Sequence, residues 1–584
     1  MTPLTTNRAA DPGIAAVRRR CYRELTLGQV PRILSAADRN PHSPTYGCLD
    51  RAFWHYRTMT DYAAPIHQEG VLSLVMTRQQ EDGENPYFGS DDLLAVAAAG
   101  LRYWCRMQRP DGSFDEFYPW ERSFVATAFT SYAVSESAWR LGEELGVEVR
   151  GEVVDALRKA CDWLDRHRDV VVVNHTAGAI AAMYNAFLLT QDRSLLGQRE
   201  RKIEDLLAHQ HEEGWFYEYG GADPAYLSLA IDYLAKDFRH SRDGRLGRCI
   251  DKALTFMVNF MHPDGSYGGE YGSRNAKYLM PHGLELLARE TPEAAYLVGA
   301  HHRGLAAGNI VAPAVMDDRY GAFFTNKYAE AWAACDHDLG HVPEEFERGG
   351  TRHFPGAGLL VRRDAESCAV VGISKHGVLK AFSVGDGARL LFSDAGYFAR
   401  FDRGRMGTSQ WLDRGVDATV ESRPDAGTRI SLSCQMKESD TSLPMRQYLV
   451  PFRLFLKLFG RSGFLMDLFS RRVKQRMIGV RRSLPLRLDR VIAIETKALK
   501  ITDRIQHAGG VRLETLGRCR DAAALHVASS RYHQRGELDV AGAWQVSKEE
   551  IDSLNAGCTL QVETKVALGV VPDQAVVRVE TKLL

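Results

Sequence analysis

Apolar residues recur at helical spacing through the first part of the chain, from about Ala15 to Leu339. Runs rich in Ala and Leu, with apolar positions three and four residues apart, alternate there with short polar turns. The clearest predicted helices are Leu93–Met107, Phe124–Leu141, Val153–Arg166, Tyr226–Lys236 and Gly247–Phe260. The pattern therefore predicts that this part of the chain is helical.

One turn recurs between these runs, and its acidic residue precedes a Gly at Asp111, Glu213 and Asp264. The copies span residues 108–114, 211–216 and 262–267. The second interval is half of the first, so a degenerate copy is expected near Asp162. A period of about 50 residues suits a repeated pair of helices. Stacked hairpins of this kind predict a curved array or an α/α toroid, with a cleft between the inner helix ends.

From about Gly349 the pattern changes to short apolar or alternating runs with Gly and Asp turns between them. The runs begin at Gly358, Cys368, Ala388, Arg429, Arg490, Leu499, Leu560 and Ala575. Period-two alternation in many short runs is typical of an antiparallel β-sandwich. We therefore expect a toroid over 1–345 and a β-sandwich over 350–584.

A segment at about 447–487 fits neither pattern. Tyr448–Phe469 is strongly apolar, and a basic tract follows it at Arg471, Arg472, Lys474, Arg476, Arg481 and Arg482. From Pro451 to Arg490 there are eleven Lys and Arg against two Asp. Such a mixture suits a helix lying in an anionic membrane surface over 448–482. It equally suits a helical insertion packed on the toroid, with its basic side lining a cleft for an anionic substrate.

Composition limits which partners and which cellular compartment are expected for this chain. Lys plus Arg and Asp plus Glu both number 74 in 584 residues, so net charge does not indicate a nucleic-acid partner. The ten cysteines are scattered without a C-x-x-C pair, which supports neither a zinc site nor a disulfide framework. Residues 1–20 lack the apolar core of a secretory signal. We expect a cytoplasmic protein, with peripheral contact at the inner membrane face as the alternative.

The first candidate chemistry is the pair Asn174-His175, at the start of an apolar helical run that continues to Leu189. A carboxamide can hydrogen-bond an anionic oxygen, and an imidazole can take up or release a proton near neutral pH. At a helix N-terminus the two could receive a carboxylate and move a proton beside it. The alternative is that Asn174 caps the helix and His175 belongs to the core.

Further along, the turn at Glu213-Gly214 leads through Glu218 and Tyr219 to Tyr226. Together with Asn174-His175, this order of motifs resembles the heparinase II/III-like polysaccharide lyases and the related uronyl C5-epimerases. The resemblance implies an α/α toroid followed by a β-sandwich. It also implies Asn174 against the substrate carboxylate, with His175 as general base and Tyr226, or failing it Tyr219, as general acid. Glu218 is expected to contact the substrate. No cofactor and no metal are expected.

A second polar group follows the third turn and is expected at the same end of the toroid. It comprises Tyr271, Arg274, Lys277 and His282. Arg and Lys there could bind substrate carboxylates or sulfates, Arg through a bidentate fork. A solvated helix start is the alternative. Arg122, after the first turn, is a weaker candidate for substrate binding.

In the β-part, the run from His376 to Tyr397 resembles the family's strand pair that carries a His to the cleft. His376 is therefore a further catalytic candidate. The sequence departs from the family pattern in two places. Val378 stands where an Asp is common, and no His-Asn pair occurs between Thr408 and Ser422.

These observations predict a lyase that removes the C5 proton of a uronic acid in an anionic polysaccharide and cleaves by β-elimination. One alternative is a uronyl C5-epimerase acting in capsule or exopolysaccharide synthesis, because the first half-reaction needs the same groups. Another is a glycan-binding assembly factor without catalysis. A terpene-cyclase toroid, suggested by residues 108–114, is disfavoured because the helical part has no Asp-rich motif.

Overall fold

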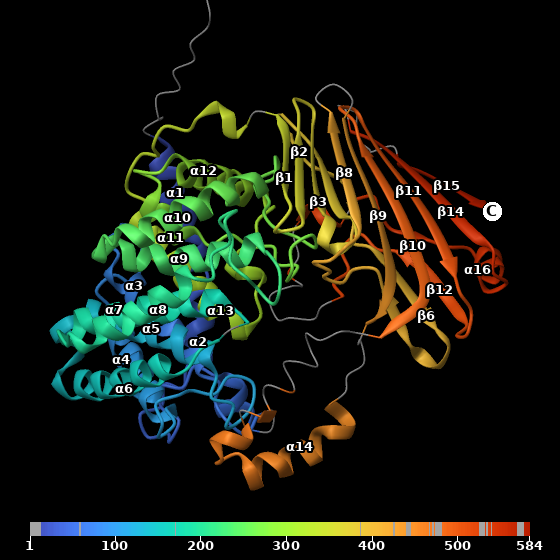
Figure 1. Cartoon of the computed structure of the whole chain (residues 1–584). Coiled ribbons are helices and arrows are strands. Elements are labelled where there is room, and N and C mark those ends of the chain that lie inside the picture. Colours follow the sequence, from blue (N-terminus) through green and yellow to red (C-terminus); the bar gives the residue numbers. More distant parts are fainter. Residues whose placement is uncertain are drawn as a thin grey trace, which may run out of the picture.

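The computed structural model describes residues 13–584 (Figure 1). The positions not described are 58–59, 170, 348, 386, 424–426, 440–444, 467, 470–471, 473–481, 525–531, 533–534, 539 and 569–576. In the part of the chain that is described, no helix combines the length and the apolarity that crossing a membrane requires.

The helical part is a closed double ring. Its inner helices are α3 (Gly70–Gln79), α5 (Phe124–Leu141), α7 (Val173–Thr190), α9 (Pro224–Ser241), α11 (Pro281–Leu287) and α13 (Asp318–Ala334). Each packs against the next, and α13 packs against α3, which closes the ring. The outer helices are α1 (Gly13–Leu27), α4 (Asp91–Met107), α6 (Val147–Arg166), α8 (Ser194–Leu207), α10 (Gly244–Met257) and α12 (Pro292–Ala307). Short α2 (Val30–Ala36) completes this part, which is the predicted α/α toroid.

Burial explains why the inner helices lack a polar stripe. Nearly every residue of α5 and α7 is buried, because one side faces the ring axis and the other faces an outer helix. An outer helix such as α6 keeps polar residues on its solvent side, as an amphipathic helix does.

The repeated turns set the spacing of the outer helices. Gly112 and Gly214 have φ of +98° and +101°, and each lies against a backbone carbonyl of the next outer helix, Lys159 in α6 and Lys252 in α10. Only glycine fits this backbone conformation at such close approach. The prediction of a copy near Asp162 was wrong, because Asp162 lies inside α6. The connection after α6 instead carries Asp169.

Replacing Gly214 by Ala is expected to lower the free energy of unfolding by about 1–3 kcal/mol. The added Cβ would overlap the Lys252 carbonyl, and φ would be strained. Chemical denaturation measures the loss. Gly151→Ala is the control, since Gly151 lies exposed in α6 with open space around its Cβ direction. Equal stability of the two variants would contradict the packing role of the turn.

Two antiparallel sheets form the second part. The smaller sheet has the order β1 (Gly350–Phe354), β2 (Leu359–Arg363), β3 (Ser367–Gly372), β4 (Val378–Ser383) and β5 (Leu390–Asp394). The larger sheet has the order β13 (Trp544–Gln545), β12 (Leu513–Arg518), β6 (Tyr397–Phe401), β7 (Met406–Thr408), β9 (Gly427–Glu438), β10 (Ser483–Ile494), β11 (Ala498–His507), β14 (Thr559–Ala567) and β15 (Val577–Leu583). Strand β8 (Ala418–Arg423) pairs with β9 alone, and helix α16 (Lys548–Asn555) packs against β12 and β14.

The central strands β3 and β4 of the smaller sheet are buried on both faces, because they lie between the toroid and the larger sheet (Figure 1), whereas the edge strand β1 is largely exposed. Alternate residues such as Val361 and Val370 join the toroid core, while their neighbours Leu360 and Val371 pack against Ile430 of the larger sheet. Because both faces of β3 are covered, the side chains on both faces are buried, and the strand is a continuous apolar run in the sequence. The predicted toroid followed by an antiparallel β-sandwich is confirmed.

Candidate active site

The first turn of α7 holds Asn174 and His175, as the sequence predicted. The free backbone N–H of Asn174 donates to Glu218 Oε1 at 3.1 Å, and its Nδ2 donates to Glu218 Oε2 at 2.8 Å. A carboxyl of the protein therefore occupies the helix N-terminus, where helical N–H groups lack partners. Asn174 is fully buried, so its amide orients Glu218 and does not stand open for a substrate carboxylate. The predicted direct role of Asn174 needs this correction.

Glu218 is fully buried between α7 and α9. Burial raises the pKa of its carboxyl well above the usual range, and the nearby Asp223 adds to the shift. Hydrogen bonds from Asn174 and the charge of Arg274 oppose the shift without cancelling it. Burial therefore favours the neutral form of the Glu218 carboxyl, whereas the two N–H groups that Asn174 donates favour the carboxylate.

Glu218→Gln is expected to gain stability relative to the native chain as pH rises. The unfolded chain releases the Glu218 proton above about pH 4.3, whereas the folded chain retains it, so native stability falls from that pH up to the folded pKa. The amide removes this penalty, and unfolding free energies from pH 5 upward would show a widening gap. Glu212→Gln, in the same turn and exposed, should show none. A native chain that gains stability over the variant with rising pH would mean that Glu218 is ionised.

His175 is held by an acidic partner that the sequence did not identify. Its Nδ1 lies 3.0 Å from Asp169 Oδ2, and its side chain is 9% exposed. An Nδ1–H donated to Asp169 leaves the lone pair on Nε2, which is the arrangement of an oriented general base. The ring of Phe129 packs edge-on at 5.7 Å and limits its rotation.

Tyr219 and Arg274 form a stacked pair beside this base. The guanidinium carbon of Arg274 lies 3.4 Å from the centre of the Tyr219 ring. Tyr219 has φ of +53°, a conformation that is rare for aromatic residues and clusters at functional sites. The carboxylate of Asp223 holds the backbone of Arg274 and of Tyr226. Its Oδ2 accepts the backbone N–H of Arg274 at 2.8 Å, and its Oδ1 accepts the backbone N–H of Tyr226 at 3.2 Å.

Tyr226 lies in the first turn of α9, with its ring 5.8 Å from that of Tyr278. Burial raises the pKa of the neighbouring Tyr219; Arg274 opposes the rise, and Tyr226, Asp169 and Glu218 add to it. These groups therefore lie within electrostatic reach of one phenol. We call the set the His175 cluster: Asp169, Asn174, His175, Glu218, Tyr219, Tyr226 and Arg274.

The His175 cluster reaches solvent where the toroid meets the β-part. Tyr219 and Tyr226 are partly exposed, and Gly220 is exposed. Leu412, in the connection between β7 and β8, lies against Gly220 and Gly221. The cluster thus combines an oriented imidazole, a guanidinium and phenols at an accessible edge, a set suited to removing a proton beside a carboxylate.

Lys277 is placed elsewhere than predicted. Its Nζ lies 2.6 Å from a carboxylate oxygen of both Glu270 and Glu537, and Lys380 bridges the same two residues at 3.3 and 3.0 Å. Although burial opposes the shift, Lys380 and Lys277 lower the pKa of Glu537 to about 2. Lys277 therefore neutralises buried carboxylates that tie the toroid to the β-part, so we withdraw it as a substrate contact.

Two further candidates belong to the interior. Tyr271 Oη hydrogen-bonds His262 Nε2 at 2.9 Å, and both side chains are buried. His282 lies 3.8 Å from Asp232 and from Glu330 on the ring axis, where burial lowers its pKa well below the usual value. Neither placement supports the predicted substrate contact.

Arg122 and His376 also have structural partners. Arg122 Nε donates to Asp111 at 2.9 Å, and its other nitrogens face the carbonyls of Gly460 and Arg461. His376 is 1% exposed; its Nδ1 pairs with the Ser409 carbonyl at 3.0 Å and its ring packs on Trp411. The structure therefore does not bring Arg122 or His376 into the His175 cluster, and the catalytic role predicted for His376 is withdrawn.

Sequence reasoning missed Asp169, Arg319 and Tyr320. Arg319 is 3.5 Å from Glu116 Oε1 and donates to the Glu116 carbonyl at 2.9 Å. The pKa of Tyr320 is raised by burial and then by Glu116, with a smaller contribution from Tyr226, so α13 borders the cluster. Asp169 lies six residues before His175 in the connection after α6, seven residues beyond the position that the turn period gives. No sequence signal pointed to α13.

A groove of about 610 Å³ lies on the larger sheet, away from the His175 cluster. Its charged lining residues include Arg429, Lys500, Arg504, Asp417 and Asp489. Among the described residues, no three His, Cys, Asp or Glu side chains converge as metal ligands.

Comparisons with known proteins complete the picture. No family model and no curated protein sequence matches this chain. The chondroitin AC lyase of Streptomyces coelicolor A3, solved in complex with chondroitin sulphate, is similar with a TM-score of 0.49 and 12% identity, over 97% of this chain and 92% of that chain.

Heparinase III is similar with a TM-score of 0.47 and 10% identity, over 100% of this chain and 85% of that chain. A GH127 β-L-arabinofuranosidase from Geobacillus stearothermophilus T6 has a TM-score of 0.36 and 11% identity, over 75% of this chain and 93% of that chain. The likeness to the lyases is distant and concerns the overall arrangement of helices and strands.

Proposed function

We propose that this chain is a polysaccharide lyase that cleaves a uronic-acid-containing glycan by C5 proton abstraction and β-elimination. The observation that carries the proposal is the His175 cluster itself. An imidazole fixed by Asp169, a guanidinium stacked on Tyr219 and the phenol-bearing start of α9 belong to one group at the surface.

Arg274 would stabilise the negative charge that develops on the substrate carboxylate when the C5 proton is removed. The C5 proton of a uronate is weakly acidic, because its loss places a second negative charge on the carboxylate. A guanidinium beside that carboxylate offsets the developing charge, most effectively where water is largely excluded. Arg274 is 4% exposed and its position is set by Asp223 and Tyr219, so it is preorganised for this role.

His175 and Tyr226 would carry the proton transfers. His175 Nε2 takes the C5 proton, and Asp169 stabilises the imidazolium that forms. The electron pair left at C5 forms the C4–C5 double bond as the C4–O4 bond breaks. Tyr226 gives its proton to the departing O4, and proton exchange with water restores both groups. The Asn174–Glu218 pair acts as a positioning element behind the base.

A panel of uronate polymers tests the proposal directly. A rise in ultraviolet absorbance from the unsaturated uronate is expected on at least one polymer, without any added cofactor. Deuterium incorporation at C5 from heavy water without chain cleavage would assign the epimerase reaction instead. Binding without either signal would sink the enzymatic proposal and leave a glycan-binding protein.

A further inference from the structure

Helix α14 (Met445–Phe459) interrupts the larger sheet between β9 and β10 and docks on the toroid. Its inner face packs on Tyr118, whose ring centre is 5.3 Å from that of Phe452. Phe469, beyond the turn at Gly460, lies 5.4 Å from Phe452 and 5.1 Å from Phe455. Figure 1 shows α14 at the lower edge of the view, apart from the two sheets.

Polar contacts also join α14 and the following turn to the toroid. Arg453 is 2.9 Å from Asp61, and the Arg122 guanidinium faces the carbonyls of Gly460 and Arg461. A Cβ at Gly460 would overlap the Trp120 ring, so the turn lies flat on the toroid. The orientation of the helix is therefore set by the toroid.

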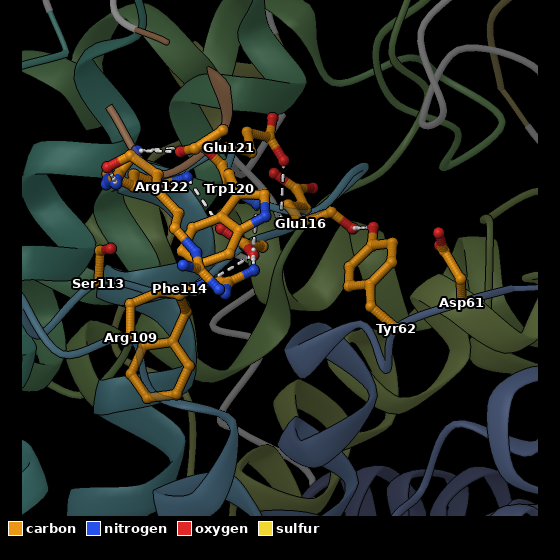
Figure 2. A network of polar contacts seen from close by, with 12 residues as sticks. Asp61, Tyr62, Arg109, Ser113, Phe114, Glu116, Trp120, Glu121 and Arg122 are labelled. Carbon is orange, nitrogen blue, oxygen red and sulfur yellow. Dashed lines mark hydrogen bonds and ion pairs between the residues drawn. The ribbon is translucent and has the colours of Figure 1, made fainter. Parts of the chain in front are cut away.

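The supporting loop, residues 109–122, is itself braced, as Figure 2 shows. Asp115 accepts the backbone N–H groups of Trp120 and Arg122 at 2.8 and 3.0 Å. Glu121 Oε2 accepts those of Glu116 and Phe117 at 2.9 and 2.6 Å. Such a closed network makes the loop a fixed platform for α14.

The outward face of α14 is apolar and uncovered in the described part of the chain. Of the eighteen large apolar side chains exposed there, eight fall within residues 448–468. They are Tyr448, Leu449, Val450, Leu454, Leu458, Phe459, Phe464 and Leu468. Val450, Leu454 and Leu458 follow one another at four-residue spacing, so they form one stripe, and Val450 and Phe464 are 75% and 77% exposed. This concentration is unusual for a surface that faces water alone.

Cations accompany the stripe. Lys457 and Arg461 are exposed beside it. The sequence from Pro451 to Arg490 carries eleven Lys and Arg against two Asp in a chain of zero net charge. Apolar and aromatic side chains bordered by cations match the chemistry of an anionic bilayer surface, which offers acyl chains beneath phosphate groups.

We propose that α14, residues 460–466 and Leu468 form a membrane-docking element that binds the surface of an anionic lipid bilayer. Val450, Leu454, Leu458 and Phe464 enter the acyl boundary, while Lys457 and Arg461 pair with lipid phosphates. The braced loop then fixes the toroid at the membrane surface. This inference does not rest on the proposed function, because lipid binding is measured without any glycan.

Vesicle flotation with the full chain tests the inference. Binding is expected to phosphatidylcholine vesicles containing about one-third phosphatidylglycerol, and to fall at least tenfold on phosphatidylcholine alone and at high salt. The triple variant Leu454→Glu, Leu458→Glu, Phe464→Glu should lose at least about tenfold in vesicle affinity. Lys457→Glu with Arg461→Glu should lose a similar factor on the anionic vesicles only.

The control is Val147→Glu with Val315→Glu, which charges two exposed apolar residues of the toroid outside 448–468 and should leave flotation unchanged. Thermal melting checks that all variants are folded. The inference is overturned if the native chain stays at the bottom of the gradient with anionic vesicles, or if the triple variant floats equally well. It is also overturned if light scattering shows a dimer that the same substitutions dissolve, since the stripe would then be an interface between two copies.

Discussion

Replacing His175 by Ala is expected to lower kcat about 10³-fold on whichever uronate polymer the native chain cleaves. His175 supplies the lone pair that takes the C5 proton, and the remaining groups of the cluster contribute no base in the same position. Asp169→Asn should lose activity to a smaller extent, because the imidazole stays in place while its tautomer and its developing charge lose their acidic partner. Initial rates of absorbance rise measure both losses.

His209→Ala is the matched control. His209 is a half-buried imidazole whose Nδ1 pairs with a backbone carbonyl, and it lies outside the cluster. Its replacement should leave kcat within about twofold. The double variant His175→Ala, Tyr226→Phe should be scarcely slower than His175→Ala alone, since base and acid serve one reaction. If His175→Ala instead collapses the melting temperature while the residual folded protein keeps its rate, His175 is a core residue and the mechanism is wrong.

Replacing Arg274 by Ala is expected to lower kcat about 10²–10³-fold, with a smaller rise in KM. The carboxylate gains charge on the way to the transition state, so the lost guanidinium matters more there than in the bound substrate. Arg274→Lys should recover part of the rate, because an ammonium keeps the charge but not the planar stack on Tyr219.

A methyl-esterified uronate polymer separates charge neutralisation from packing. The ester has no carboxylate charge to offset, so the loss caused by Arg274→Ala should shrink markedly on it, whereas a loss from disturbed packing would be equal on both polymers. Arg106→Ala provides the control, because Arg106 also stacks on a tyrosine, Tyr103, but on the outer helix α4. An unchanged loss on the ester would contradict the role assigned to Arg274.

The candidate site was predictable only in part. Asn174, His175, Glu218, Tyr219, Tyr226 and Arg274 were selected from the sequence, and the structure assembles them into one group. Lys277 lies three residues from Arg274 in the same loop, yet it faces Glu537, 260 residues along the chain. A loop has no periodicity that says which side chain faces which neighbour, so the two cations could not be told apart.

The segment at 447–487 illustrates the same limit. Its composition left open whether it packs on the toroid or contacts a membrane. The structure shows that Phe452 of α14, together with Phe469, packs on Tyr118 of the toroid, whereas Leu454 and Leu458 are exposed. The sequence supplied the amphipathic pattern, but only the position of Tyr118 decides which face is covered.

The sequence by itself determined the secondary structure and the fold class of this protein. Helical and alternating periodicities are local properties, so α5 runs from Phe124 to Leu141 as predicted and β2 begins within one residue of the expected position. Only the tertiary structure decided the functional geometry. Asp169 reaches His175 from the connection after α6, and Glu218 accepts the N–H groups of Asn174 from the connection before α9. Lys277 is neutralised by Glu270 of the toroid and by Glu537 of the β-part. Pairing between charged side chains depends on distance in space, which no local pattern encodes.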